Sequence, residues 1–140
     1  MQIALLSASA GISSFESPAA EFAQSELILD DILIERKSST FLARASGRSM
    51  EWVGIYDRDI LVIDRAAPKG KTDVIVAVLN GQFICKLLER QTGILYSCQH
   101  GWPQPKPFKI SPDDDYLEEG IVIRSIRLHR EPALLAGAGL

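Results

Sequence analysis

Cysteine is scarce in this sequence, and long apolar runs are missing. Its 140 residues hold two cysteines, Cys85 and Cys98, which are too few for a disulfide scaffold and lack the spacing of a zinc site. No uninterrupted apolar stretch approaches the roughly 18 residues that indicate a transmembrane helix. We therefore expect two reduced thiols in a cytoplasmic protein that has no membrane span and needs no metal or cofactor.

A basic excess is also missing. The net charge is −3 and the sequence pI is about 5.4, so direct binding to nucleic acid is not expected. A connection to DNA would run through a protein partner. Hydrophobic residues make up 46 % of a chain long enough for one domain, and this is sufficient for a packed core.

Composition divides the chain into three parts. Residues 1–25 are rich in serine and alanine and show no sustained period, which predicts a flexible N-terminal arm. Apolar residues at helical spacing in 26–35 predict one short helix at the start of a domain that runs from 26 to 130. Residues 131–140 are small and apolar without periodicity, which predicts a flexible tail.

The domain after the helix is predicted to be mainly β. Asn80-Gly81 lies between two apolar runs and predicts a type I′ hairpin turn, because both residues tolerate positive φ. A loop is expected over 99–116, with a short strand near Phe108. The other strands are expected at 41–45, 60–63, 73–79, 82–88, 94–98 and 120–128. This pattern predicts a single curved sheet or a small barrel.

A serine follows a sharp turn after the first of these strands. The segment at 46–50 reads Ser-Gly-Arg-Ser-Met, and Gly47 allows the chain to reverse so that Ser49 presents its hydroxyl beside free backbone N–H groups. Such amides can stabilise an oxyanion. A serine near a glycine is more often only a turn residue, so this segment alone does not identify a nucleophile.

A single lysine interrupts an apolar strand. In 83–88 (Phe-Ile-Cys-Lys-Leu-Leu), Lys86 shares one strand face with Ile84 and Leu88, and the opposite face is apolar as well. Burial lowers the pKa of a lysine, and a neutral amine can take a proton from a serine hydroxyl. The run by itself favours a simpler interpretation, in which the lysine stem packs and the ammonium reaches water at an edge.

Together, these two features resemble the LexA/UmuD family of self-cleaving serine–lysine peptidases. Ser-Gly-Arg-Ser-Met is similar to the nucleophile motif of that family, and the segment at 81–86 (Gly-Gln-Phe-Ile-Cys-Lys) resembles the strand that provides its base. Ser-Pro-Ala-Ala at 17–20 resembles the segment behind the cleaved arm. The resemblance implies a Ser49 nucleophile, a Lys86 general base and an oxyanion site at the backbone amides of Arg48 and Ser49.

The family cuts its own chain between a small residue and glycine. Ahead of the domain, Ala10-Gly11 is the pair of this kind, and an extended arm is long enough to bring it to Ser49. Alignment by strict spacing would instead place the cut at Ser13-Ser14, which lacks glycine. We therefore favour Ala10-Gly11 as the cleavage site.

The resemblance also implies a biological role. Cleavage would be activated by a RecA filament on single-stranded DNA, during the SOS response to DNA damage. The shortened product would then serve, as a homodimer, as an accessory subunit of a Y-family translesion polymerase. An alternative stays open, because some relatives exist already in the shortened, active form. The chain would then be a non-cleaving binding subunit in which Ser49 and Lys86 are idle.

Two other peptidase classes fit the sequence less well. A LexA-type repressor needs a helix-turn-helix domain, and only about 25 residues precede the predicted helix. A leader peptidase needs a membrane anchor, which the sequence lacks. Three residues depart from the usual family pattern: Arg48 stands at a commonly acidic position, and Arg58 and Thr72 stand where glycine is frequent. These departures leave the local turn geometry open.

Overall fold

The structure, a computed structural model, describes residues 1–6 and 28–136. It is mainly β, as the sequence predicts. The strands are β1 (Gln2–Leu6), β2 (Thr40–Ser46), β3 (Ile60–Asp64), β4 (Thr72–Leu79), β5 (Gln82–Glu89), β6 (Ile94–Ser97), β7 (Lys106–Phe108) and β8 (Tyr116–Ile126). The helices are α1 (Leu29–Leu33) and α2 (Ala133–Ala136), with 3-10 turns at Lys37–Ser39 and Glu51–Val53. None of the helices in the described ranges reaches the length and hydropathy of a transmembrane segment.

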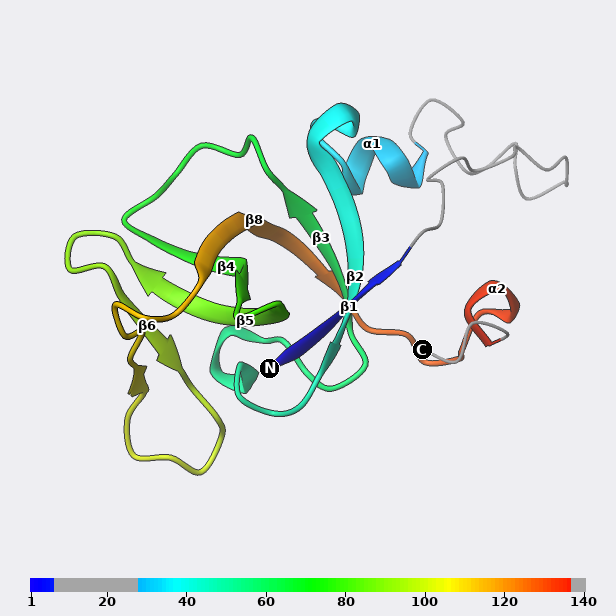
Figure 1. The fold of residues 1–140 in the computed structure, drawn as a ribbon. Coiled ribbons are helices and arrows are strands. Elements are labelled where there is room, and N and C mark those ends of the chain that lie inside the picture. The colour runs from blue at the N-terminus through cyan, green and yellow to red at the C-terminus, as the bar shows by residue number, and fades with distance from the viewer. Residues whose placement is uncertain (7–27, 137–140) are drawn as a thin grey trace, which may run out of the picture.

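Six of these strands close into a barrel. The sheet order is β1-β2-β3-β8-β4-β5-β6-β7, and β1 returns to pair with β5. β1 runs antiparallel to β2 over its whole length and meets β5 where Gln2 lies opposite Ile84. Figure 1 shows the N-terminal end of β1 beside β5. β6 and β7 continue the sheet beyond β5 and lie outside the barrel.

The strands predicted from the sequence are confirmed, although some of their ends differ. The largest difference is in β8, which begins at Tyr116 rather than at Gly120. Of the predicted helix at 26–35, the structure describes residues 28–35, and among these the helix spans Leu29–Leu33. β1 lies in the segment that the sequence assigned to the arm, and α2 lies in the predicted tail. The sequence did not predict either of these two elements.

The turn between β4 and β5 has the conformation that the sequence predicts. Asn80 has φ 49° and Gly81 has φ 81°, so both central residues are left-handed, as a type I′ turn requires. The hairpin then pairs Leu79 with Gln82 and continues in unbroken register to Thr72 opposite Glu89. This regular pairing fixes which residues of β5 face the barrel and which face outward.

Two hydrophobic clusters lie on the two faces of the sheet. The first fills the barrel and includes Ile3, Ala43, Ala45, Met50, Leu61, Ile63, Val76, Cys85 and Cys98. The second lies outside the barrel, beneath β6 and β7, and consists of Ile75, Ala77, Leu88, Leu95 and Ile121 with Phe108 against it. Because side chains alternate along a strand, Cys85 points into the barrel and Lys86 points toward the outer cluster.

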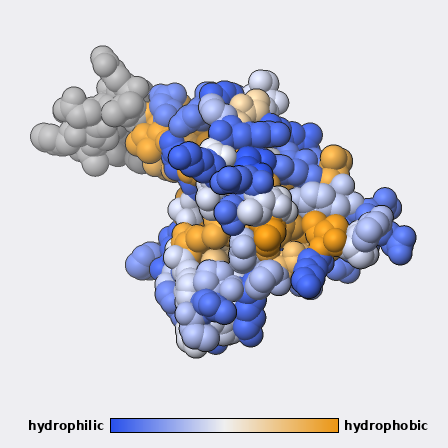
Figure 2. Space-filling model, turned by 90° about the vertical axis from the view of Figure 1, so that its left-hand side faces the viewer, coloured by the Kyte–Doolittle hydropathy of each residue, from blue (hydrophilic) through white to orange (hydrophobic). Residues whose placement is uncertain are grey.

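The face formed by β4, β5 and β6 is mostly hydrophilic. Figure 2 shows a band of apolar side chains that crosses this side of the molecule between two polar regions. Among the strand residues whose side chains are described, Ile94 and Leu117 are the exposed large apolar ones, at 39 % and 63 %. A hollow of about 350 Å³ is lined by Thr72, Leu87, Glu89, Tyr96, Gln104 and Pro105. Neither Ser49 nor Lys86 lines this hollow.

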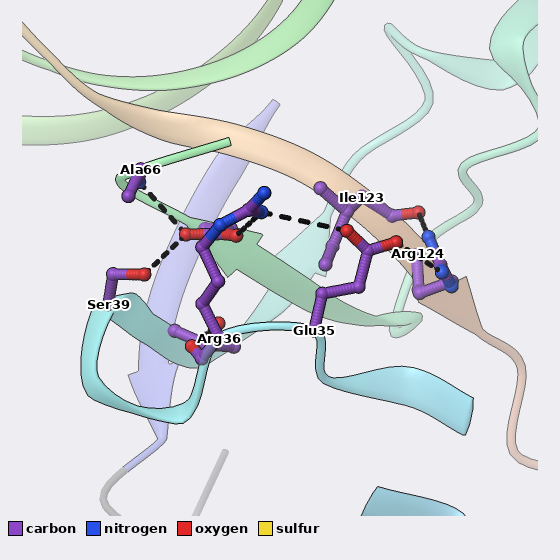
Figure 3. Close-up of polar contacts among 8 residues, drawn as sticks. Glu35, Arg36, Ser39, Ala66, Ile123 and Arg124 are labelled. Carbon is purple, nitrogen blue, oxygen red and sulfur yellow. Dashed lines mark hydrogen bonds and ion pairs between the residues drawn. The ribbon is translucent and has the colours of Figure 1, made fainter. Parts of the chain in front are cut away.

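Asp64, at the end of β3, is a buried carboxylate that anchors the segment ahead of β2 (Figure 3). It accepts hydrogen bonds from Arg36 (2.9 Å), from the Ser39 hydroxyl (2.6 Å) and from the N–H of Ala66 (2.9 Å). Burial by itself raises the pKa of Asp64, but the three hydrogen bonds outweigh burial and hold this pKa below its ordinary value. The residues between α1 and β2 are therefore tied to the barrel.

β8 bends because it carries two bulges. Its register shifts between Val62 and Ile63 on the β3 side, and between Val76 and Ala77 on the β4 side. Gly120 pairs with Val76 at the second shift. A Cβ at Gly120 would come within 2.7 Å of the Ile63 side chain. Glycine is therefore the residue that fits here without displacing β3.

Replacement of Gly120 by alanine should destabilise the fold by about 1–3 kcal/mol, the usual cost of overpacking a core. Denaturant unfolding of both proteins measures this difference. Gly70→Ala is the matched control, because its nearest atom is the flexible carboxylate end of Asp73, at 3.1 Å. A loss no larger than that of the control would contradict the close contact between β8 and β3.

Replacement of Asp64 by asparagine should cost about 1–3 kcal/mol at neutral pH, because a buried hydrogen-bonded carboxylate is lost. A depressed folded pKa means that the carboxylate stabilises the fold above its unfolded pKa, and that this stabilisation disappears as the pH falls through the folded pKa. The gap between wild type and variant should therefore narrow below about pH 4. Unfolding at neutral and acid pH, with Asp113→Asn as the exposed control, tests this, and a constant gap would contradict it.

Candidate active site

Ser49 lies in the loop between β2 and β3. Gly47 has φ 102°, a conformation that favours glycine, and its N–H donates to the Asp57 carboxylate (2.8 Å). The carbonyl of Ser49 accepts a hydrogen bond from the N–H of Cys98 (2.6 Å). The next residue, Met50, is fully buried in the barrel. The predicted turn at Gly47 is confirmed, and the loop that holds Ser49 is fixed on both sides.

Lys86 lies in the middle of β5 and is 6 % exposed. Its Nζ donates a hydrogen bond to the Ser97 hydroxyl (2.6 Å) and lies 4.4 Å from the centre of the Phe108 ring. Burial lowers the pKa of Lys86. The side chain is therefore buried against β6 and β7, and its ammonium does not extend into water at an edge of the sheet.

The α-amino group of Met1 lies at the same place. It donates a hydrogen bond to Ser49 Oγ (2.7 Å), and the Met1 carbonyl accepts one from the N–H of Cys85 (3.1 Å). Burial, followed by the nearby Lys86 ammonium, lowers the pKa of this amine to about 6. The Met1 amine is thus a neighbour of both Ser49 and Lys86. The hydrogen bond that Lys86 donates goes to Ser97 and not to Ser49.

This arrangement is suited to proton transfer from a serine hydroxyl to an amine. The serine is held in a rigid loop, and the Met1 amine that hydrogen-bonds to it has a pKa of about 6. Burial also lowers the pKa of Lys86, which favours the neutral, basic form of that amine. In the ranges 1–6 and 28–136, no three His, Cys, Asp or Glu side chains lie close enough to hold a metal ion.

Backbone amides beside Ser49 are available to an incoming oxygen. Within the described part of the chain, the N–H groups of Arg48 and Ser49 make no hydrogen bond to a backbone carbonyl. The guanidinium of Arg48 instead pairs with the buried carboxylate of Glu51 (3.1 Å), which also accepts the N–H of His100 (3.2 Å). The unusual basic residue at position 48 is thus matched by a local ion pair.

The other two departures have different structural settings. Arg58 has φ 73°, the left-handed conformation for which glycine is favoured, and its guanidinium lies 3.3 Å from Glu131. Thr72 is the first residue of β4 and pairs with Glu89. The turn at Arg58 therefore keeps a glycine-like backbone without a glycine.

Sequence reasoning missed three groups near Ser49 and Lys86: Ser97, Phe108 and the Met1 amine. Leu87 pairs with Tyr96, so the antiparallel register places Ser97 directly opposite Lys86. That register depends on the turn between β5 and β6, which the sequence did not define. The predicted cleavage pairs, Ala10-Gly11 and Ser13-Ser14, lie outside the described residues.

Comparison with known proteins gives consistent matches. Residues 3–96 match the family model described as Peptidase S24-like. Protein ImpA of Escherichia coli is 42 % identical over 74 residues, which are 53 % of this chain and 51 % of ImpA. Protein MucA of Escherichia coli is 33 % identical over 117 residues, 82 % of this chain and 78 % of MucA. The LexA repressor of Bordetella avium is 28 % identical over 111 residues, 79 % of this chain and 51 % of the repressor. The matches thus span about half the length of ImpA and of this repressor.

Replacement of Ser97 by alanine should lower the pKa of Lys86 further, because the ammonium form loses its hydrogen-bond acceptor while its burial remains. Titration of the Lys86 Cε resonance by NMR measures this pKa directly. Ser97→Thr keeps a hydroxyl and should restore the wild-type value. An unchanged Lys86 pKa in Ser97→Ala would show that the hydroxyl does not hold the lysine.

Proposed function

Because the chain belongs to the Peptidase S24-like family, as a UmuD-like member of the LexA/UmuD group, we propose that it is a serine peptidase that cuts its own N-terminal arm. Ser49 is the nucleophile and Lys86 is the general base. The observation that supports this proposal best is the buried Lys86, whose pKa is lowered by burial, next to an amine that hydrogen-bonds to Ser49. Within residues 1–6 and 28–136, no carboxylate pairs with Lys86. A buried lysine without such a partner needs a reason, and general-base catalysis supplies one.

The reaction is acyl transfer to Ser49 followed by hydrolysis. Neutral Lys86 accepts the hydroxyl proton as Ser49 Oγ attacks the carbonyl carbon of Ala10. The amides of Arg48 and Ser49 hold the oxyanion. The bond to Gly11 then breaks, and Lys86 returns the proton to the departing nitrogen. Water hydrolyses the ester and releases residues 1–10, so each chain reacts once and no metal or cofactor takes part.

Cleavage requires β1 to leave its place first. In the described structure, Met1 lies at Ser49 and Leu6 pairs with Leu42, so the chain runs away from the nucleophile. At about 3.3 Å per residue, Gly11 would lie far beyond Leu6 if the strand simply continued. The arm must therefore detach and slide until Ala10-Gly11 replaces Met1 at the site.

The biological role follows from the family resemblance. We infer that a RecA filament on single-stranded DNA promotes cleavage in the SOS response, and that the shortened chain, as a homodimer, joins a UmuC-like Y-family polymerase for translesion synthesis. The net charge of −3 fits binding to proteins better than binding to DNA. The carbonyl of Ser49 is already fixed by Cys98, so an activator has to move the arm rather than assemble the nucleophile loop.

One observation favours the alternative of a non-cleaving binding subunit. Residues 2–6 form a barrel strand instead of an open arm, and Ile3 is part of the hydrophobic core. A chain that needs this strand for its fold would keep it. In that case the dimer and polymerase surfaces alone would be functional.

Incubation of the purified full chain, followed by intact-mass measurement, distinguishes these functions. Loss of residues 1–10 should occur in the wild type, faster with a RecA filament, and should fall by at least about 1000-fold in Ser49→Ala and Lys86→Ala. Lys69→Ala, at an exposed position, is the matched control. A different cut that still requires Ser49 would keep the peptidase and correct the cleavage site, whereas no cut under any condition would favour the binding subunit.

The pH dependence gives a second test. Because Lys86 acts only when it is neutral, the spontaneous rate should rise as the pH passes through the lowered pKa of Lys86 and then level off. Single-turnover cleavage rates between about pH 6 and about pH 10 measure this profile. A flat rate across this range would contradict the role of Lys86 as the base.

A further inference from the structure

The direction of β1 is the starting observation. Met1 lies at Ser49, Gln2 pairs with Ser46, and the remaining residues continue antiparallel to β2, away from the nucleophile. On its other edge, β1 contacts β5 through the hydrogen bond from the N–H of Cys85 to the Met1 carbonyl. A peptide bond placed immediately before Met1 would therefore lie across Ser49.

This is the geometry of the amine side of a cut peptide. When a serine peptidase forms its acyl-enzyme, the departing nitrogen lies beside the serine oxygen and takes a proton from the base. The Met1 nitrogen is 2.7 Å from Ser49 Oγ, and the nearby Lys86 ammonium lowers the pKa of the Met1 amine. Residues 1–6 thus occupy the position that the amine-side product of a cut would take, with the Met1 amine in place of the product's amino terminus.

We propose that the cleft between β2 and β5 is a docking site for a peptide amino terminus on the leaving-group side of Ser49, and that Met1–Leu6 occupies it and shields the nucleophile. This inference rests on the proposed function, because a peptide can have a leaving group at Ser49 only if Ser49 is the nucleophile. The ligand is a β-strand peptide with a free α-amino group. In the described structure, the chain itself supplies this peptide.

The third residue of the ligand provides the side-chain anchor. Ile3 is 9 % exposed, pairs with Ala45 and packs in the barrel among small side chains such as Ala43. Backbone pairing is independent of sequence. Recognition therefore rests on the α-amine of the first residue of the peptide and on the apolar side chain of its third residue. Gln2, by contrast, is exposed.

The anchor position discriminates between the two cleavage sites. A cut at Ala10-Gly11 would place Ser13 where Ile3 lies now, whereas a cut at Ser13-Ser14 would place Glu16 there. Burial of a carboxylate without a partner costs far more than burial of a hydroxyl. The cleft therefore favours Ala10-Gly11, in agreement with the family preference for glycine.

The charges around the docked amine are compatible with its burial. In the described part of the chain, Lys86 and Cys85 on β5 are the titratable groups that act on the amine. Burial raises the pKa of the Cys85 thiol to about 12, so this thiol stays neutral. Burial and Lys86 lower the pKa of the Met1 amine to about 6. Near neutral pH this amine is therefore mostly uncharged and does not place a second full positive charge beside Lys86.

Release of β1 should expose Ser49 to a small reagent. Ile3→Asp places a carboxylate in the core and should undock the strand, whereas Gln2→Asp adds the same charge at an exposed position and is the control. A fluorophosphonate forms a bond from phosphorus to an activated serine oxygen and releases fluoride. Intact mass follows its rate, and Ile3→Asp should react at least about tenfold faster, the change that about 1.4 kcal/mol of lost docking gives.

The outcomes separate this proposal from the proposed function. Faster labelling in Ile3→Asp, with Gln2→Asp at the wild-type rate, supports docking. Equal labelling of all three proteins overturns docking and leaves the peptidase in place.

If none of the three proteins is labelled, the proposed function fails, and hydrogen exchange at the Cys85 N–H then tests the docking of β1. Protection in wild type and in Gln2→Asp, lost in Ile3→Asp, supports docking, and rapid exchange in wild type overturns it.

The same exchange experiment controls for unfolding. Amides that pair β3 with β8, such as those of Leu61 and Ser125, should stay protected in Ile3→Asp. If they lose protection, Ile3→Ala replaces this variant, because it weakens the anchor without a buried charge. The same two results then support or overturn the docking of β1.

Discussion

The pairing of β1 with both β2 and β5 is the interaction on which the site depends. It closes the barrel, and it does so between the strand that leads to Ser49 and the strand that contains Lys86. The strand therefore completes the fold and at the same time places the Met1 amine against Ser49. A protein built in this way links the exposure of Ser49 to the position of β1.

Two of the buried charged side chains, Asp64 and Lys86, have opposite environments. Asp64 receives three donors, and its charged form is stabilised. Lys86 has one hydroxyl acceptor and an aromatic ring, and burial shifts it toward the neutral form. The first arrangement holds a segment in place, whereas the second favours the neutral form of an amine. The difference lies in the number and kind of partners, since both side chains have little contact with water.

The fold was largely predictable because most strands are local patterns. Alternation of apolar residues located β2 to β6 and β8, and Asn80-Gly81 fixed one turn with its conformation. β1 was not predictable, because its partner strands are distant in sequence and its few residues show no sustained period. Ser49 and Lys86 came from a family pattern. Ser97 could not be found in this way, because its role depends on the β5–β6 register.

The closing strand also constrains the order in which the protein can fold. Among the described strands, β1 comes before β2, β3 and β4 in the chain, and β5 follows these three. Contacts between distant segments require loop closure before pairing can stabilise them, so they form late. A nascent chain therefore passes through a stage in which one edge of β1 is unpaired and open to other strands. The pairing of β1 with β5 is therefore the last to close the barrel.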